Sequence, residues 1–384
     1  MVPPKPAAGS PHRHADPRRA AVHRVPMRHP GDTAAIEALF DSGALDPAAV
    51  VAILGKTEGN GCVNDFTRAY AVQALSHMLA RRLGTTAEAI RAGIALVMSG
   101  GTEGGLSPHF LVLAVTAGEA ANPSGALAIG IAFTPDFAPE EIGRMAQVDA
   151  TADAVRRAMA EAGISDPAGV HYVQVKCPLL TNDSMAQARA RGAAVATEDT
   201  YASMGLSRGA SALGVALALG EVARVEAGGI GRDWSKFSGR ASASAGVELE
   251  RNEVIVLGNS MAWAGDLRIA HAVMDDAIDL PAVRRAVAAV GMPLEEGQVP
   301  AAMADCLVAV LAKAEPSSSG RIRGQRHIMW DDSDINATRH ARALVGGVIA
   351  GVVGRTDIFV SGGAEHQGPD GGGPVAVIAR PARV

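Results

Sequence analysis

The feature that most constrains this chain is a short pattern that occurs three times: a serine followed, four positions later, by a glutamate. The three copies occupy residues 99–103, 244–248 and 361–365. The first and third copies begin where an apolar run typical of a buried strand ends. The serines lie 145 and 117 residues apart, which is too far for the stacked repeats of a solenoid. The spacing predicts three similar units that close around a pseudo-threefold axis.

The chain of 384 residues is long enough for three such units and a tail. We expect a disordered tail over residues 1–22, which are rich in Pro, Arg, His and Ala and lack the apolar core of a secretory signal. We place repeat unit A at residues 23–120, unit B at 121–250 and unit C at 251–384. Strand and helix signals alternate in each unit, which predicts an α/β fold.

Each unit also carries a lysine and an arginine ahead of its serine. The lysine follows an apolar run, the arginine follows a Ser or Thr near a helix start, and the serine ends a strand. The sets are Lys56, Arg68 and Ser99; Lys176, Arg208 and Ser244; and Lys313, Arg339 and Ser361. Burial lowers the pKa of a lysine amine, so that the amine can accept a proton from a neighbouring hydroxyl. Three such sets predict a cage of Ser and Arg donors around a small, carbonyl-rich ring.

Each residue of these sets also has an ordinary structural explanation, because the arginines can pair with the repeated glutamates and the lysines can be solvated at the surface. The symmetry does not choose the nucleophile among Ser99, Ser244 and Ser361. Ser242 competes with Ser244, although only Ser244 keeps the four-residue spacing to a glutamate. A peptidase or β-lactam-type acylase of the Ser-Lys type would carry Ser-x-x-Lys on one helix, and none of the three repeated serines begins such a tetrad.

Composition excludes several classes of partner. A net charge of -5 and 3% aromatic residues argue against a nucleic-acid surface. No apolar run approaches the ~20 residues that span a bilayer. Three cysteines, Cys62, Cys177 and Cys306, have no CxxC spacing, so we expect a reducing, cytoplasmic location. No HxxH or HExxH motif occurs, and we interpret His109 and His366 as hydrogen-bonded loop residues rather than zinc ligands.

Six longer motifs are unusual enough to identify a family. They are GKTEGNGCVND at 55–65, VMSGGTEG at 97–104, VQVKCP at 173–178, SRGASALG at 207–214, SDIN at 333–336 and SGGAEHQGP at 361–369. Together they resemble the cyanuric acid hydrolase and barbiturase family of ring-opening amidohydrolases, over residues 23–380. The resemblance implies an α/β fold with three pseudo-symmetric repeat units around a threefold axis. Its strands would form a central barrel with helices outside, and the chains would form a homotetramer.

The resemblance also implies roles for the repeated residues. Ser244 would be the nucleophile and Lys176 the base that activates it, while Asn336 would influence the choice of substrate. The substrate would be bound by Lys56, Arg68, Ser99, Gly100, Arg208, Lys313, Arg339, Ser361 and Gly362. The reaction would be hydrolytic opening of a cyclic imide-like amide through an acyl-enzyme.

Two substrates remain open at this point. Cyanuric acid would give carboxybiuret, which loses carbon dioxide to form biuret, and barbituric acid would give ureidomalonic acid. We favour cyanuric acid because its ring shares the threefold symmetry of the expected site. An alternative of another class is a non-catalytic module that binds a small metabolite, which predicts saturable binding without turnover.

A glycine-rich loop near the C-terminus suggests a metal site. Glu315 and the loop over residues 364–373 offer one carboxylate and many carbonyl oxygens, which suit a hard cation such as Mg²⁺ or Ca²⁺. The resemblance implies as ligands Glu315 and the backbone of Ala364, Gln367, Gly368, Pro369 and Gly372. The alternative is a turn without an ion. We expect a structural role, because the site lacks the open position that metal-activated water needs, and we expect no organic cofactor.

Overall fold

The computed structural model describes residues 17–381, so most of the expected tail lies outside the described residues. The boundary at residue 22 is wrong, because residues 18–22 belong to the first strand, β1 (Arg18–Pro26). β1 pairs antiparallel over its whole length with β4 (His109–Ala117). These residues are therefore part of the first sheet.

Unit A forms a sheet with the strand order β3-β2-β4-β1, extended at the β1 edge by the two residues of β9 (Trp263–Ala264). The remaining elements of this unit are α1 (Ala34–Asp41), β2 (Val50–Thr57), α2 (Phe66–Leu83), α3 (Ala87–Gly93) and β3 (Ala95–Gly100).

Unit B forms a second sheet with the order β5-β8-β6-β7. Its elements are β5 (Ala126–Phe133), α4 (Met145–Glu161), β6 (Val170–Cys177), α5 (Asn182–Ala190), α6 (Thr200–Ala218), β7 (Ala241–Ala245) and β8 (Glu253–Ser260). We placed unit C at residues 251–384, which assigns β8 to unit C. This is wrong, because β8 pairs antiparallel with both β5 and β6. Unit B therefore extends at least to Ser260.

Unit C forms a third sheet with the order β10-β15-β11-β14. Its elements are β10 (Arg268–Met274), α7 (Leu280–Ala289), β11 (Leu307–Ala314), the hairpin strands β12 (Arg321–Ile322) and β13 (Gln325–Arg326), α8 (Ala337–Val353), β14 (Phe359–Gly362) and β15 (Gly373–Ala379).

The three sheets share one topology. In each, the unit's first strand pairs antiparallel with its fourth, the fourth antiparallel with its second, and the second parallel with its third. The fold is therefore α/β with an internal threefold repeat of strand order. Between residues 17 and 381 the strands make three separate main sheets rather than one closed barrel.

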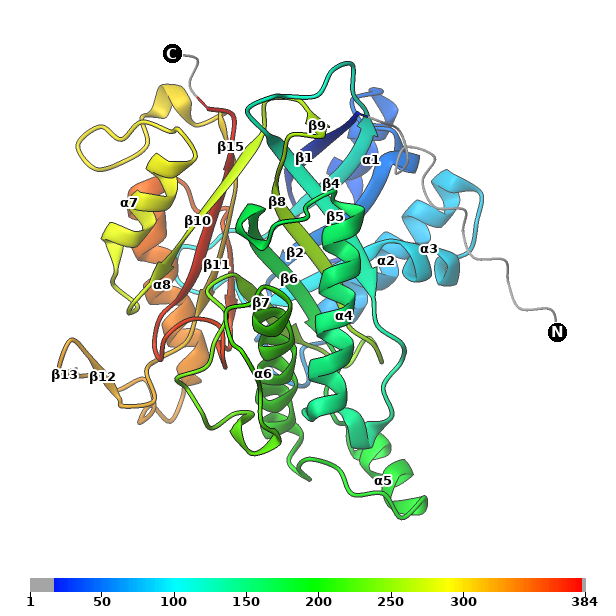
Figure 1. The fold of residues 1–384 in the computed structure, drawn as a ribbon, viewed down its shortest axis with the longest axis vertical. Coiled ribbons are helices and arrows are strands. Elements are labelled where there is room, and N and C mark those ends of the chain that lie inside the picture. Colours follow the sequence, from blue (N-terminus) through cyan, green and yellow to red (C-terminus); the bar gives the residue numbers. More distant parts are fainter. Residues whose placement is uncertain (1–16, 382–384) are drawn as a thin grey trace.

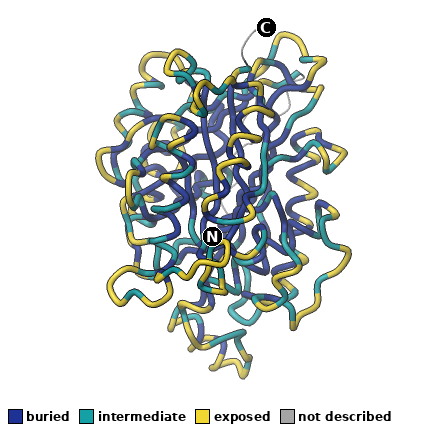
Figure 2. The backbone as a smooth tube through the Cα atoms, turned by 90° about the vertical axis from the view of Figure 1, so that its left-hand side faces the viewer, coloured by how far each residue is buried: buried dark blue, intermediate teal, exposed yellow. Residues whose placement is uncertain are grey.

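The strands run through the middle of the molecule and the helices lie outside them (Figure 1). The inner faces of the sheets meet in one apolar core, which includes Leu54 of β2, Tyr172 of β6 and Leu311 of β11. Because both faces are covered, β2 and β11 are buried along their whole length, and Figure 2 shows the exposed residues mainly on the periphery.

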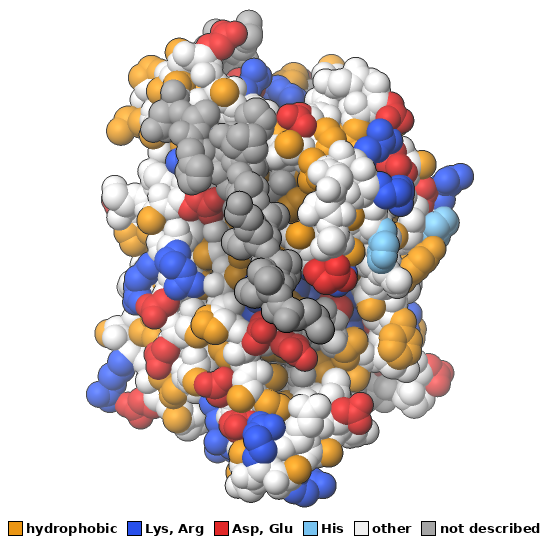
Figure 3. Space-filling view, turned by 90° about the vertical axis from the view of Figure 1, so that its right-hand side faces the viewer, with side chains coloured by type: hydrophobic (Ala, Val, Ile, Leu, Met, Phe, Trp, Pro, Cys, Tyr) orange, Lys and Arg blue, Asp and Glu red, His pale blue; other side chains and the backbone are white. Residues whose placement is uncertain are grey.

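Helices α2, α6 and α8 each precede the third strand of their unit. Their N-caps are Asp65, Asp199 and Asn336, whose side chains accept hydrogen bonds from backbone N–H groups of the first turn. Acidic and basic side chains are interspersed over the face shown in Figure 3. No helix within residues 17–381 is long and apolar enough to cross a bilayer.

Candidate active site

The parallel strand pair of each unit places its lysine directly opposite its serine. All six side chains are buried. The register partners are Lys56 and Ser99 on β2 and β3, Lys176 and Ser244 on β6 and β7, and Lys313 and Ser361 on β11 and β14. Because side chains alternate between the two faces of a strand, each pair points to the same side of its sheet.

A small cavity of about 20 Å³ lies where the three serines meet. Each unit contributes one arginine, one serine and the small residue after that serine. The lining consists of Arg68, Ser244, Ala245, Arg208, Ser361, Gly362, Arg342, Ser99, Gly100, Gly61 and Met204. Such a ring of guanidinium, hydroxyl and backbone groups offers hydrogen-bond donors from three directions to one small ligand.

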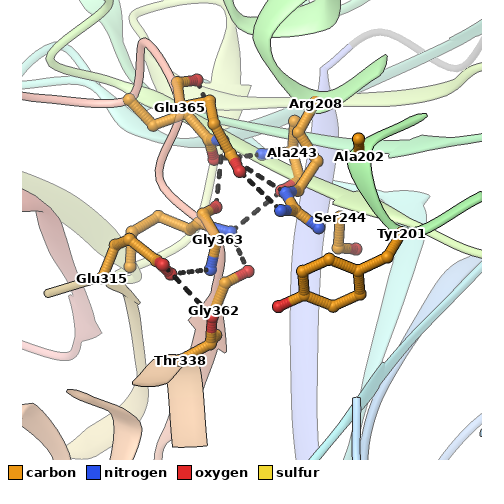
Figure 4. Close-up of polar contacts among 12 residues, drawn as sticks. Tyr201, Ala202, Arg208, Ala243, Ser244, Glu315, Thr338, Gly362, Gly363 and Glu365 are labelled. Carbon is orange, nitrogen blue, oxygen red and sulfur yellow. Dashed lines mark hydrogen bonds and ion pairs between the residues drawn. The ribbon is translucent and has the colours of Figure 1, made fainter. Parts of the chain in front are cut away.

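The repeated glutamates hold two of the arginines in this ring. Arg208 of unit B makes two hydrogen bonds to Glu365 of unit C, at 2.6 and 2.7 Å. Figure 4 shows the Arg208 guanidinium between Glu365 and Ser244. Burial alone would raise the pKa of Glu365, but Arg208 lowers it below its ordinary value. A forked pair of this kind fixes the plane of the guanidinium.

The same arrangement relates the other units. Arg342 of unit C makes hydrogen bonds of 2.6 and 2.7 Å to Glu103 of unit A. Arg68 of unit A lies 4.0 Å from Glu248 of unit B. Each arginine thus faces the glutamate of another unit. The same arginines therefore pair with the repeated glutamates and line the cavity.

The arginine of unit C that lines the cavity is Arg342, whereas the sequence analysis chose Arg339. The side chain of Arg339 is 38% exposed and reaches Glu103 with one hydrogen bond of 3.1 Å. The side chain of Arg342 is 3% exposed. We chose Arg339 because it follows a threonine, as Arg68 does. The better signal is the buried face of α8, which includes Arg342 and Val345.

We expect Arg342→Lys to lower kcat/KM by about tenfold or more, because lysine cannot make the forked contact with Glu103 while facing a ligand. Arg339→Lys is the matched control on the same helix and should change kcat/KM by less than about twofold. Steady-state kinetics of both variants with cyanuric acid would check this. A larger loss for Arg339→Lys would restore the assignment made from the sequence.

The three serines are not equivalent. Ser99 donates a hydrogen bond of 3.3 Å to Ser361, and Lys56 and Lys313 donate to these two serines at 3.4 and 3.2 Å. Within residues 17–381 the buried Oγ of Ser244 has no hydrogen-bond partner. Ser244 is therefore the serine whose hydroxyl remains available to a ligand in the cavity.

The surroundings lower the pKa values of the three lysines to different degrees. Burial holds the pKa of Lys56 and of Lys313 well below the ordinary value. Burial also lowers the pKa of Lys176, but Glu248 opposes this shift, with a distance of 2.9 Å between Lys176 Nζ and Glu248 Oε1. Lys176 Nζ also donates a hydrogen bond of 2.7 Å to the carbonyl of Met98 in unit A.

Ser242, the competing candidate, is fully buried on β7, where its register partner is Gln174. It is absent from the lining of the central cavity, which among the described residues includes Ser244 from this strand. The buried Oγ of Ser242 also has no hydrogen-bond partner within the described residues, so what favours Ser244 is its place in the cavity lining.

The residues of the expected metal site lie beside the cavity. Glu315 is half-buried and accepts hydrogen bonds from Gly363 N at 2.9 Å and from Thr338 Oγ1 at 3.1 Å (Figure 4). Burial, together with the nearby Glu365, raises the pKa of Glu315 to about 7. The carbonyls of Ala364 and Pro369 each accept one N–H within the loop. Each keeps a second lone pair.

Asn336 and the two histidines lie away from the central cavity. Asn336 caps α8 and donates a hydrogen bond of 3.0 Å to the hydroxyl of Tyr201. His366 Nε2 accepts from Gly231 N, and His109, on β4, contacts the carbonyl of Ser107. Both histidines are thus engaged with backbone groups.

Comparisons with known proteins agree with this geometry. Residues 21–380 match the model of the family described as amidohydrolase ring-opening protein. The cyanuric acid amidohydrolase of Azorhizobium caulinodans is 57% identical over 362 residues, which cover 94% of this chain and 98% of the relative. The enzyme of that name from Methylobacterium sp. (strain 4-46) is 58% identical over 369 residues, with coverage of 95% and 98%.

Two solved structures are also similar. A cyanuric acid hydrolase described as an evolutionary innovation by structural concatenation has a TM-score of 0.90 and 52% identity, covering 94% of this chain and 99% of its own. The cyanuric acid hydrolase of A. caulinodans has a TM-score of 0.87 and 56% identity, with coverage of 95% and 100%. Sequence, fold and cavity agree, and the chain belongs to the family of ring-opening amidohydrolases.

Proposed function

We propose that this protein is a cyanuric acid amidohydrolase, which opens the s-triazine ring by hydrolysis of one ring amide. The observation that carries the proposal is the central cavity, where each of three units supplies one arginine and one serine. Cyanuric acid is a small ring with three equivalent carbonyl groups, so its symmetry matches that of the donors. The names of the relatives at 57% and 58% identity support the same substrate.

In the first chemical step the Oγ of Ser244 attacks a ring carbonyl carbon. The proton of the hydroxyl passes to the neutral amine of Lys176, whose pKa burial lowers. The carbonyl oxygen becomes an oxyanion, which the cavity arginines and the backbone around the serines stabilise. Lys176 is the register partner of Ser244, but within the described residues their side chains are not hydrogen-bonded: Lys176 Nζ contacts Glu248 and the carbonyl of Met98, and it turns to Ser244 for the transfer.

In the second step the ring C–N bond breaks and the leaving nitrogen takes the proton from Lys176. Water then attacks the ester on Ser244, with Lys176 again accepting a proton, and releases the ring-opened carboxylic acid. The product from cyanuric acid is carboxybiuret, which loses carbon dioxide to give biuret. Ser361, whose hydroxyl accepts hydrogen bonds from Ser99 and Lys313, keeps its own proton to donate to another carbonyl group, and Ser99 holds Ser361 in place.

The test is turnover of cyanuric acid and of barbituric acid by the purified protein, followed by loss of ring absorbance and by carbon dioxide release. The proposal requires consumption of cyanuric acid. If barbituric acid alone is consumed, the serine chemistry is retained and the substrate is wrong. If neither ring is consumed but one binds saturably, the protein is a binding module.

We also propose that a hard divalent cation is held by Glu315 and by the backbone of Ala364, Gln367, Gly368, Pro369 and Gly372. The residues fit such an ion, because the half-buried Glu315 lies near a second carboxylate, Glu365, while Arg208 offsets part of their charge. A cation would neutralise the excess charge, and carbonyl oxygens suit Mg²⁺ or Ca²⁺. Its role would be to hold the loop that carries Glu365.

Removal of this cation is expected to lower the Tm of the wild type. At about 100 times its Kd an ion contributes about 2.7 kcal/mol to the free energy of unfolding. Glu315→Gln should have a lower Tm than the wild type before any chelator is added, and its Tm should not change when a chelator is added. Glu119→Gln, an exposed carboxylate in a loop, should respond like the wild type. Equal chelator responses in all three proteins would contradict the site.

We also propose a pseudo-threefold arrangement of the units and a homotetramer of chains. A cavity built from all three units supports a pseudo-threefold axis through its centre. The homotetramer rests on the family resemblance alone. Light scattering of the purified protein tests it directly, because a monomer or dimer mass would exclude it.

A further inference from the structure

A second and larger hollow lies directly beside the central cavity. The volume of this cleft is about 510 Å³. It is bounded by the start of α6, the loop before α8 and the loop after β14, and its lining includes Tyr201, Trp234 and Trp330. Arg208 lines both the cleft and the central cavity, so its guanidinium stands in the wall between them.

The cleft gathers aromatic side chains that are scarce elsewhere. The chain has three Trp and three Tyr residues, and half of these six line this cleft. The residues Tyr201 and Trp330 are 50% and 51% exposed. Exposed aromatic rings next to a reactive cavity offer flat apolar surfaces on which a planar ring can stack.

Hydrogen bonds hold these rings in place. The Trp330 indole donates a hydrogen bond of 2.8 Å to the carbonyl of Ser317. The Tyr201 hydroxyl accepts one from Asn336, which joins the start of α6 in unit B to the cap of α8 in unit C. Figure 4 shows Tyr201 beside Ser244 and Gly362, on the side of Arg208 away from Glu365.

We propose that this cleft is the vestibule through which the substrate reaches the central cavity. This inference rests on the proposed function. A planar heterocycle with several ring carbonyls stacks on Tyr201 or Trp330 and then passes Arg208, whose guanidinium receives a carbonyl oxygen. Asn336, which we expected from the sequence to influence the choice of substrate, acts through the position of Tyr201 rather than by contact in the cavity.

Another cleft, on the side of Lys176, offers a competing route for the substrate. It is lined by Lys176 and Glu248 and by the charged residues Arg91, Asp136 and Arg251. Among the described residues its lining includes no aromatic side chain. It therefore reaches the catalytic lysine but offers no surface for stacking a planar ring.

Substitution of two exposed alanines, one in each cleft, tests the two routes separately. Ala202 on α6 lines the aromatic cleft, Ala92 on α3 lines the charged cleft, and both are exposed. Ala202→Trp fills the vestibule and is expected to lower kcat/KM for cyanuric acid at least tenfold. Ala92→Trp should leave kcat/KM within twofold of the wild type. A loss confined to Ala92→Trp overturns the proposal, because the substrate then enters through the charged cleft.

A second pair of variants keeps the test decisive if Ala202→Trp does not fold. Trp330→Ala and Tyr201→Ala remove the stacking surfaces and should lower kcat/KM three- to tenfold while kcat changes less than twofold. Tyr70→Ala, at an exposed tyrosine on α2, is the control for loss of a surface ring. Unchanged kcat/KM in both cleft variants overturns the vestibule. Absence of turnover in the wild type would instead reject the proposed function itself.

Discussion

Replacing Ser244 with alanine is expected to lower kcat for cyanuric acid by on the order of 10⁴-fold or more, as removal of an attacking serine does in other hydrolases. Ser244 is the repeated serine whose Oγ has no hydrogen-bond partner within the described residues. The variant should keep the Tm of the wild type and still bind the ring, because the three arginines remain. Turnover and binding of cyanuric acid, measured on the same preparation, check both statements.

Ser99→Ala and Ser361→Ala are the matched controls, since each removes one hydroxyl from an equivalent strand end. These two serines are hydrogen-bonded to each other and to lysines, so their loss should lower kcat/KM by about 10- to 100-fold. If either variant is inactive while Ser244→Ala retains activity, the nucleophile belongs to another unit.

Replacing Lys176 with methionine is expected to lower kcat by about 10² to 10⁴-fold, because the variant keeps the volume of the side chain but lacks the proton acceptor. The acceptor must be neutral, and burial lowers the pKa of Lys176. Activity should therefore rise with pH through the pKa of Lys176 and be lost as pH falls below it. This limb should be absent from the pH profile of Lys176→Met.

Glu248 offers a sharper form of this prediction. Its carboxylate favours the charged form of Lys176 and so opposes the effect of burial on the lysine pKa. Glu248→Gln should lower the pKa of Lys176 further and move the acidic limb of kcat/KM to lower pH. Glu250→Gln, two residues away and exposed, should leave the limb in place. A limb that moves to higher pH in Glu248→Gln would contradict the role of Lys176 as base.

The pairing of lysines with serines could be predicted from the sequence because local signals mark the strand ends on which these residues lie. Each lysine and each serine ends an apolar strand, and a parallel pair brings such ends together. The repeat of four residues from serine to glutamate also survives in the structure, where Glu103 and Glu365 each hold an arginine of another unit. The family resemblance rests on the same residues.

Long-range contacts explain what the sequence did not reveal. The strand β8 begins at Glu253, soon after the serine-to-glutamate pattern of unit B, which ends at Glu248. From the sequence it therefore looked like the first strand of unit C. Its place between β5 and β6 is set by pairing across more than 70 residues of chain. The choice of Arg342 over Arg339 depends on which side of α8 faces the cavity. The apolar residues Ala341, Val345 and Ile349 mark that side of the helix and Arg342 lies on it, but we followed the preceding threonine instead.

The inequality of the three serines was equally hidden. Ser99 and Ser361 are 262 residues apart and meet only because the sheets converge. That contact joins two of the three serine hydroxyls and leaves Ser244 as the repeated serine without a hydrogen-bond partner in the described part of the chain. No local pattern could distinguish it, since all three copies have the same spacing to their glutamate.

The most direct test of the central claim is to trap the acyl-enzyme. The wild-type protein would be mixed with excess cyanuric acid, quenched in acid during turnover, digested and mapped by mass spectrometry. We predict a mass increase on the peptide that contains Ser244, and none on that peptide in Ser244→Ala. An increase on the peptides that contain Ser99 or Ser361, or turnover that persists in Ser244→Ala, would contradict the account.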